Sequence, residues 1–222
     1  MSKNRFTGEK NVLASYDYLD YFVSRALNPK FKSKQKLLRN RDSTSHLISL
    51  FALATSIQAK SILELGVRRG ITTMPLLYAA SLFEGTLDSV DIKKTKFVPP
   101  KSLRKHWRYH KQDSIGFLKK LPQDRSYDFV FIDDWHAYEH VKEEISLLSE
   151  HVRQDSLITL HDLMLHTSPE YNEDIMPGDD ELYDGGPYRA VSALNRDEWE
   201  FATIPIMNGL TILRKLKPTV AN

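Results

Sequence analysis

The stretch Ile62-Leu63-Glu64-Leu65-Gly66-Val67-Arg68-Arg69-Gly70 decides how this chain is built. Its first four residues continue a short apolar run that begins at Ser61, which is typical of a buried strand. Gly66 and Gly70 then bracket a tight turn, and residues 72–83 have the apolar spacing of a helix. The stretch therefore predicts a strand, a glycine-bounded turn and a helix in direct succession, the unit from which parallel sheets are made.

The same alternation continues on both sides of this unit. Further strands are expected at 86–91, 107–110, 127–132, 156–160, 198–204 and 210–213, and further helices at 11–27, 42–59, 114–121, 139–151 and 188–194. In the helix at 139–151 one face is apolar through Val141, Ile145 and Leu148, so Glu143 and Glu144 are expected to face solvent. The pattern predicts an α/β fold: a Rossmann-like, doubly wound, mostly parallel seven-stranded sheet with an antiparallel C-terminal hairpin and N-terminal helices.

The composition bounds the kind of protein. Its 222 residues suffice for one ordinary α/β domain and fall short of two. Cysteine is absent, which excludes disulfides, thiolate zinc sites and a cysteine nucleophile. The polar start shows no secretory signal, and the longest apolar stretch, residues 47–57, is too short to span a bilayer. We expect a cytoplasmic protein without membrane contact, divided into an N-terminal helix with a basic linker at 1–41 and a main domain at 42–222.

Charge is balanced in total but segregated along the chain, with 31 basic and 29 acidic residues. Residues 1–41 and 93–111 are mainly basic, whereas residues 169–184 contain acids and no Lys or Arg. Such blocks can steer a charged partner, but no nucleic-acid-binding motif accompanies them. We therefore expect a solvated surface, and nucleic acid is an unlikely partner.

Acidic or small residues follow each of the first five expected strands, where parallel sheets bind their ligands. At the first strand end Gly66 lets the backbone approach a ligand, and Gly70 lets the helix pack onto the strand. Arg68 stands where a dinucleotide fingerprint requires glycine, which disfavours a nicotinamide cofactor. Asp91 ends the second strand, where a carboxylate can accept both ribose hydroxyls of an adenosine ligand.

This ordered set resembles the motifs of class I S-adenosylmethionine-dependent methyltransferases. The form Glu-x-Gly-x-x-x-Gly is most similar to the catechol and caffeoyl-CoA O-methyltransferase group and its bacterial sugar- and antibiotic-tailoring relatives. The resemblance covers roughly residues 44–214 and implies S-adenosyl-L-methionine as cofactor. The cofactor contacts that it implies are Glu64, Gly66, Arg68, Gly70, Thr72, Asp91, Gln112, Asp113 and Trp135. Asp113 could equally be the N-cap of the helix that follows it.

The segment Phe131-Ile132-Asp133-Asp134-Trp135-His136-Ala137-Tyr138-Glu139 contains the residues expected for catalysis. It resembles both the Asp-x-Trp form of the catechol group and the Asp-x-Asp-His-x-Tyr-Glu form of the bacterial relatives. The resemblance implies a metal ligand at Asp133 and a base or substrate contact at His136. The chemistry agrees, because a hydroxyl must lose its proton to attack a sulfonium methyl, and imidazole titrates near neutral pH.

A divalent cation would lower the pKa of that hydroxyl. Asp133 and Asp162 end strands that are expected to be neighbours, so their carboxylates could share magnesium or manganese. The fifth strand ends in His161-Asp162, whereas the catechol group has Asp-Asn. Three arrangements stay open: Asp162 is a ligand and His161 is not, the metal is softer than magnesium and His161 binds it, or no metal binds.

The loop at 164–186 is too long for a plain connector, and its glycines suit a lid over an acceptor. Its acidity disfavours a strongly anionic acceptor. The sequence thus predicts a metal-assisted O-methyltransferase for a hydroxylated small molecule: a sugar, a natural product or a catechol-like compound. Two alternatives stay open, a nicotinamide-dependent oxidoreductase and a catalytically degenerate methyltransferase fold that binds nucleic acid or protein. The N-terminal helices could shape the acceptor pocket or support a homodimer.

Overall fold

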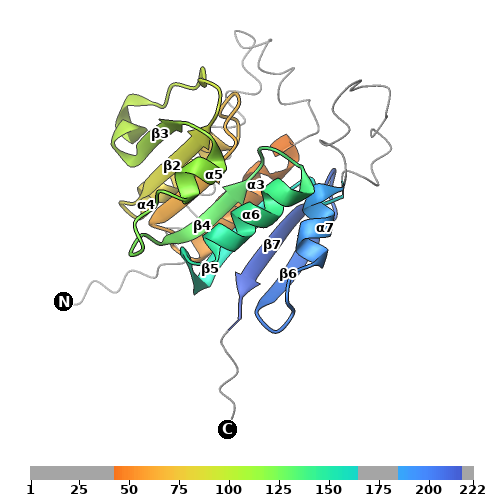
Figure 1. Ribbon diagram of the computed structural model, residues 1–222. Coiled ribbons are helices and arrows are strands. Elements are labelled where there is room, and N and C mark those ends of the chain that lie inside the picture. Colours follow the sequence, from red (N-terminus) through yellow and green to blue (C-terminus); the bar gives the residue numbers. More distant parts are fainter. Residues whose placement is uncertain (1–42, 165–184, 217–222) are drawn as a thin grey trace, which may run out of the picture.

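The computed structural model describes residues 43–164 and 185–216, and every structural statement below refers to them. They form a seven-stranded sheet in the order β3-β2-β1-β4-β5-β7-β6 (Figure 1). β1 to β5 pair in parallel, and β7 runs antiparallel between β5 and β6. This arrangement confirms the predicted fold class. The strands are β1 Ser61–Leu65, β2 Thr86–Asp91, β3 Trp107–Lys111, β4 Tyr127–Ile132, β5 Val152–His161, β6 Trp199–Ile204 and β7 Leu210–Lys215.

Helices cover both faces of the sheet (Figure 1). On one face α3 (Leu47–Ser56) and α4 (Thr73–Leu82) enclose a core that includes Phe129 and Phe131 of β4. On the other face α5 (Ser114–Leu118), α6 (Tyr138–Leu148) and α7 (Gly186–Ser192) cover Val130 and Ile132. Successive side chains of β4 thus enter opposite cores, as expected for a strand buried on both faces. No helix within the described ranges has both the length and the apolar character that a membrane crossing requires.

Several expected elements have shifted ends. β5 begins at Val152 rather than at residue 156, and β7 continues to Lys215. The helix expected from residue 42 starts with a 3-10 turn, η2 (Ser43–His46), and a second one, η3 (Lys101–His106), precedes β3. The expected helix at 11–27, the segment 1–41 and nearly all of the expected lid lie outside the described residues.

One orientation predicted for α6 is wrong. Glu143 is exposed as expected, and its carboxylate lies 2.6 Å from Lys119 Nζ. Glu144, however, has no exposed surface. It follows Val141 by three residues and therefore shares the helix face that packs on the sheet. The pattern of apolar residues alone could not indicate that an acid is buried on this face of the helix.

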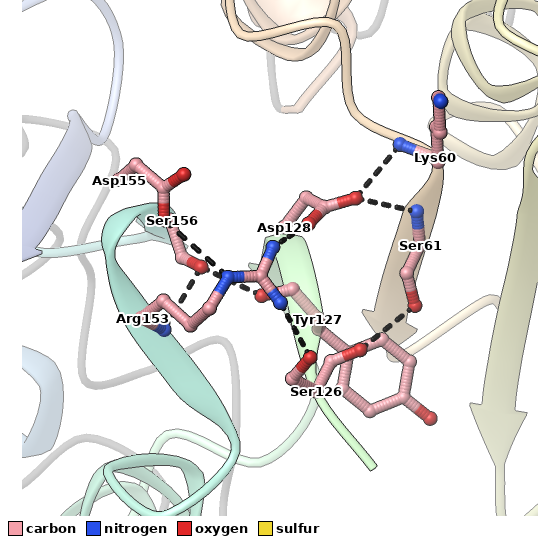
Figure 2. A network of polar contacts seen from close by, with 8 residues as sticks. All are labelled: Lys60, Ser61, Ser126, Tyr127, Asp128, Arg153, Asp155 and Ser156. Carbon is pink, nitrogen blue, oxygen red and sulfur yellow. Dashed lines mark hydrogen bonds and ion pairs between the residues drawn. The ribbon is translucent and has the colours of Figure 1, made fainter.

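A polar network joins the amino ends of three neighbouring strands (Figure 2). One carboxylate oxygen of Asp128 in β4 accepts hydrogen bonds from the backbone N–H groups of Lys60 and Ser61, at 2.8 and 2.9 Å. Arg153 in β5 donates to the other oxygen of Asp128 and to Ser126 Oγ. The network stabilises the end of the sheet opposite to the one where the predicted functional residues lie.

Candidate active site

A cavity of about 430 Å³ lies at the carboxyl ends of β1, β2 and β4, within the size range of small-molecule sites. It is formed at the strand ends where the sequence predicted a ligand site. Glu64, Gly70 and Thr72, which were also predicted to contact a cofactor, are not part of its wall. The lining consists of Gly66, Arg68, Val90, Asp91, Ile92, Lys93, Gln112, Asp113, Ser114, Asp133, Asp134, Trp135 and His140.

Gly66 is required where β1 passes close to the end of β4. Its φ of +89° lies in the left-handed region, and a Cβ there would lie 2.1 Å from the carbonyl oxygen of Asp133. Any other residue would push these two strand ends apart. At Gly70 (φ +73°) the nearest obstacle to a Cβ is the side chain of Phe97, at 2.4 Å. This glycine therefore makes room for an aromatic ring that covers the turn.

The carboxylate of Asp91 organises the turn after β1. One of its oxygens accepts hydrogen bonds from the backbone N–H groups of Val67 and Arg68, at 3.0 and 2.8 Å. The other accepts from the N–H of Lys93 at 2.7 Å. Each carboxylate oxygen has two lone pairs, so the oxygen that accepts only from Lys93 keeps one for a ligand in the cavity.

Glu64 lies beneath this turn, without exposed surface. Its carboxylate accepts hydrogen bonds from the hydroxyls of Thr72, Thr73 and Ser89, at 2.7–3.0 Å. Burial raises the pKa of Glu64 to about 7, although the three hydroxyl donors oppose this effect. The contacts join β1 to the start of α4 and to β2, so Glu64 and Thr72 support the cavity from behind.

The adenine-side residues predicted from the resemblance line the cavity. Gln112 and Asp113 follow β3, and Asp113 Oδ2 also accepts a 2.6 Å hydrogen bond from the N–H of Gly116, as an N-cap of α5 does. The capping alternative for Asp113 is thus realised, and the side chain still reaches the cavity wall. Trp135 and Ile92 are half exposed or more, at 50% and 67%. They offer apolar surface to a flat ligand.

Next to the cavity, the ends of β4 and β5 bring together the residues predicted for catalysis. His136 Nε2 lies 2.7 Å from an oxygen of Asp162 and 3.9 Å from one of Asp133. His161 Nδ1 lies 3.5 Å from Asp133 Oδ1 and 2.9 Å from Asp162 Oδ1. Asp162 has a left-handed φ of +64°, which turns its side chain back toward the other members. His161 also contacts the ring of His46 edge-on, at 5.3 Å.

The electrostatics of this acid–histidine cluster are coupled. Burial raises the pKa of Asp133, against the effect of the neighbouring His161. Burial acts in the same direction on Asp162, but contacts with His136 and His161 outweigh it and hold the pKa of Asp162 below its usual range. Burial lowers the pKa of His136, and the contact with Asp162 reverses this and raises it. Burial lowers the pKa of His161, but the neighbouring Asp133 and Asp162 reverse this effect and raise it well above its ordinary value.

The donor set fits a divalent cation. One oxygen each of Asp133 and Asp162 and Nε2 of His136 lie within 4.8 Å of one another. Two carboxylates with an imidazole suit manganese, iron or zinc as well as or better than magnesium. A cation between the two acids would compete with the protons of the neighbouring histidines, because metal binding releases protons from its ligands.

A model of the family described as Methyltransferase domain matches residues 63–163. These residues form a methyltransferase domain. It extends from β1 to just beyond β5 and contains the whole lining of the cavity and the Asp133–His136–Asp162 cluster. The recognition made from the sequence, a class I methyltransferase, is confirmed.

Solved structures share the fold of this methyltransferase domain. TomG from Streptomyces achromogenes, an O-methyltransferase involved in tomaymycin synthesis in complex with SAM, has a TM-score of 0.61 and 17% identity over 90% of this chain and 96% of its own. The O-methyltransferase from Bacillus cereus in complex with SAH has a TM-score of 0.60 and 16% identity over 90% and 97%. SAH-bound methyltransferase PaMTH1 from Podospora anserina has a TM-score of 0.62 and 12% identity over 98% of both chains. No curated protein matches the sequence.

The sequence interpretation missed a second group of side chains in the methyltransferase domain: Asp134, His140 and Glu144. Burial raises the pKa of Glu144 to about 8. Burial lowers the pKa of His140, but Asp134 and Glu144 reverse this effect and raise it to about 10. The signal that could have found the group is the spacing of His140 and Glu144, one helical turn apart on the inward face of α6.

Proposed function

We propose that this domain transfers the methyl group of S-adenosyl-L-methionine to a hydroxyl oxygen of a small molecule, with a divalent cation beside the reacting oxygen. The observation that supports this proposal best is the position of Asp133. It belongs both to the cavity wall and to the acid–histidine cluster. A cofactor in the cavity would therefore lie next to the group of residues that can bind a cation and move a proton.

The residues of the cavity wall suit different parts of the cofactor. Asp91 offers the ribose hydroxyls a carboxylate that backbone donors already orient. Ile92 and Trp135 offer the adenine ring apolar surface, and Gln112 and Asp113 lie in the same wall. Gly66 leaves room between the two strand ends, where a larger side chain would intrude.

The proposed chemistry begins with the acceptor hydroxyl. Asp133 and Asp162, with His161 beside both, would hold the cation, which lowers the pKa of a bound hydroxyl. His136 would take the proton. A cation on the two acids would also weaken their hold on the His136 proton, which leaves this imidazole neutral and able to act as a base. The in-line displacement then depends mainly on how donor and acceptor are positioned.

The proposal also specifies the methylated atom, which is oxygen, and the acceptor, which is a hydroxylated small molecule. The named O-methyltransferases of the same fold support oxygen as the methylated atom. A sugar, a natural product or a catechol-like compound fits this chemistry. A cytoplasmic location and a homodimer are further expectations, which cell fractionation and light scattering test.

Calorimetric titration of S-adenosylmethionine, with and without magnesium or manganese, tests the cofactor. Turnover on a panel of sugars, phenols and catechols then tests the acceptor. We expect binding of the cofactor by the wild type, and weaker metal affinity in Asp162→Asn. No cofactor binding under any condition would overturn the proposal and favour the alternative, a catalytically degenerate methyltransferase fold that binds nucleic acid or protein.

A further inference from the structure

We propose that Asp134, His140 and Glu144 form a second metal site, separate from the Asp133–His136–Asp162 cluster, and that its ligand is a zinc ion. One donor atom from each of the three residues lies within 4.8 Å of the others. The inference does not depend on the proposed methyl transfer, because it concerns side chains that the proposed chemistry does not use.

The distances around His140 Nε2 match those between ligands of one ion. Glu144 Oε1 lies 3.3 Å from this nitrogen, Asp134 Oδ2 lies 3.4 Å away, and Ser114 Oγ lies 3.1 Å away. Zinc binds nitrogen and carboxylate oxygen at about 2.0–2.2 Å, so the ligands of a tetrahedral zinc are about 3.4 Å apart. The ligands of octahedral magnesium, at about 2.0–2.1 Å from the metal, are only about 2.9 Å apart at adjacent positions.

Hydrogen bonding alone accounts poorly for this arrangement. A single ring nitrogen carries at most one proton, yet three oxygens surround it, and only that of Ser114, at 3.1 Å, lies within the usual hydrogen-bond range of about 2.7–3.2 Å. Glu144 has no exposed surface, and neither of its carboxylate oxygens has a hydrogen-bond partner of good geometry in the described part of the chain. The same holds for Oδ1 of Asp134. Buried carboxylate oxygens without such partners are costly, and a cation bound in place of the proton on His140 would offset this cost.

The donor types also favour zinc. Two carboxylates and one imidazole, which would lose its proton when a metal binds, leave one position of a tetrahedron, which Ser114 Oγ or a water could take. Imidazole is a poor ligand for magnesium and a good one for zinc. Asp134, His140 and Ser114 line the cavity, so an ion can enter from there.

The ion would join three elements of the fold. Asp134 follows β4, His140 and Glu144 lie on α6, and Ser114 begins α5. The ring of Trp135, 5.7 Å from that of His140, lies beside the site. Zinc would therefore fix the cavity wall formed by the starts of α5 and α6 against the sheet.

Metal content and cobalt spectroscopy of the full chain test this site apart from the first cluster. Asp162→Asn removes one of the two acids of the first cluster, and the protein is then treated with a chelator and reloaded with zinc or cobalt alone. We expect this variant to retain one equivalent of zinc after dialysis and to show the intense visible absorption of four-coordinate cobalt. Zinc should also raise its Tm.

Adding His140→Gln or Glu144→Gln should remove the bound equivalent, the cobalt absorption and the rise in Tm. Glu143→Gln is the matched control, because it changes the exposed neighbour on the same helix and should retain all three. Circular dichroism verifies that the variants fold. If Glu144→Gln does not fold, the result for His140→Gln decides the test. The proposal is overturned if Asp162→Asn binds neither metal, or if binding survives the loss of His140.

Discussion

Glu64 is an acid held without exposed surface, and its pKa of about 7 exceeds the ordinary 4.5. Between these values the folded chain keeps a proton that the unfolded chain has released, so stability falls as pH rises through this window. We expect the wild type to lose roughly 3 kcal/mol of unfolding free energy relative to Glu64→Gln between about pH 5 and pH 8. Urea unfolding of both proteins across this range measures the difference, and parallel pH profiles would contradict it.

His136 is the residue on which the proposed chemistry depends most. We expect His136→Ala to abolish turnover and to leave S-adenosylmethionine affinity within a few-fold, because His136 is not part of the cavity lining. Calorimetry and a methyl-transfer assay measure the two quantities. His110→Ala is the control, since His110 pairs with Asp88, outside the cavity wall. Near-normal turnover in His136→Ala would remove the assignment of this residue as base.

At the scale of elements, α5 is a short helix whose start depends on one side chain. Asp113 Oδ2 accepts the N–H of Gly116, and Asp113 also lines the cavity. We expect Asp113→Ala to cost about 1 kcal/mol of stability through the lost cap. An additional loss of S-adenosylmethionine affinity would indicate a contact with adenine. Asp124→Ala, at an exposed position, is the control for stability and should change neither quantity.

At the scale of the whole molecule, the amino ends of the strands contribute to stability, and the carboxyl ends form the candidate site. Asp128 joins β4 to β1 and β5 at the amino ends (Figure 2). We expect Asp128→Asn to lose about 2–3 kcal/mol of stability, because a charged acceptor of three donors is weakened, without a change in cofactor affinity. Asp155→Asn removes only an exposed partner of Arg153 and should change stability by less than about 0.5 kcal/mol. Equal effects of the two changes would contradict this view.

The positions of the strands and helices along the chain could be predicted because the strands differ from the helices in apolar period and are separated by glycine- and proline-containing turns. The placement of Asp91, Asp133 and Asp162 followed from one rule, that parallel strands bring their carboxyl ends to the same edge. Element ends were less predictable. β5 extends back to Val152, which pairs with Tyr127 of β4, and the polar residues 153–156 in between interrupt the apolar pattern on which the prediction relied.

The details of the site that escaped prediction are those set by tertiary packing. The sequence did not indicate the three hydroxyls that surround the carboxylate of Glu64, which come from the start of α4 and from β2. Glu144 was expected in solvent because apolar residues marked only part of the inward face of α6. His140 becomes notable only once β4 and the start of α5 lie beside it. The periodicity of apolar residues indicates which way a side chain points, but not which residues of other elements that side chain contacts.

The central strand pair has a consequence for the order of events in folding. β1 and β4 are neighbours, although Lys60 and Asp128, which bond at their ends, are 68 residues apart in sequence. Closing so long a loop is slow compared with local pairing, so this contact belongs to the late part of the reaction. Gly66 and Asp133 face each other across it, and the cavity does not exist before it closes. A ligand of the cavity should therefore slow unfolding and leave the rate of folding nearly unchanged.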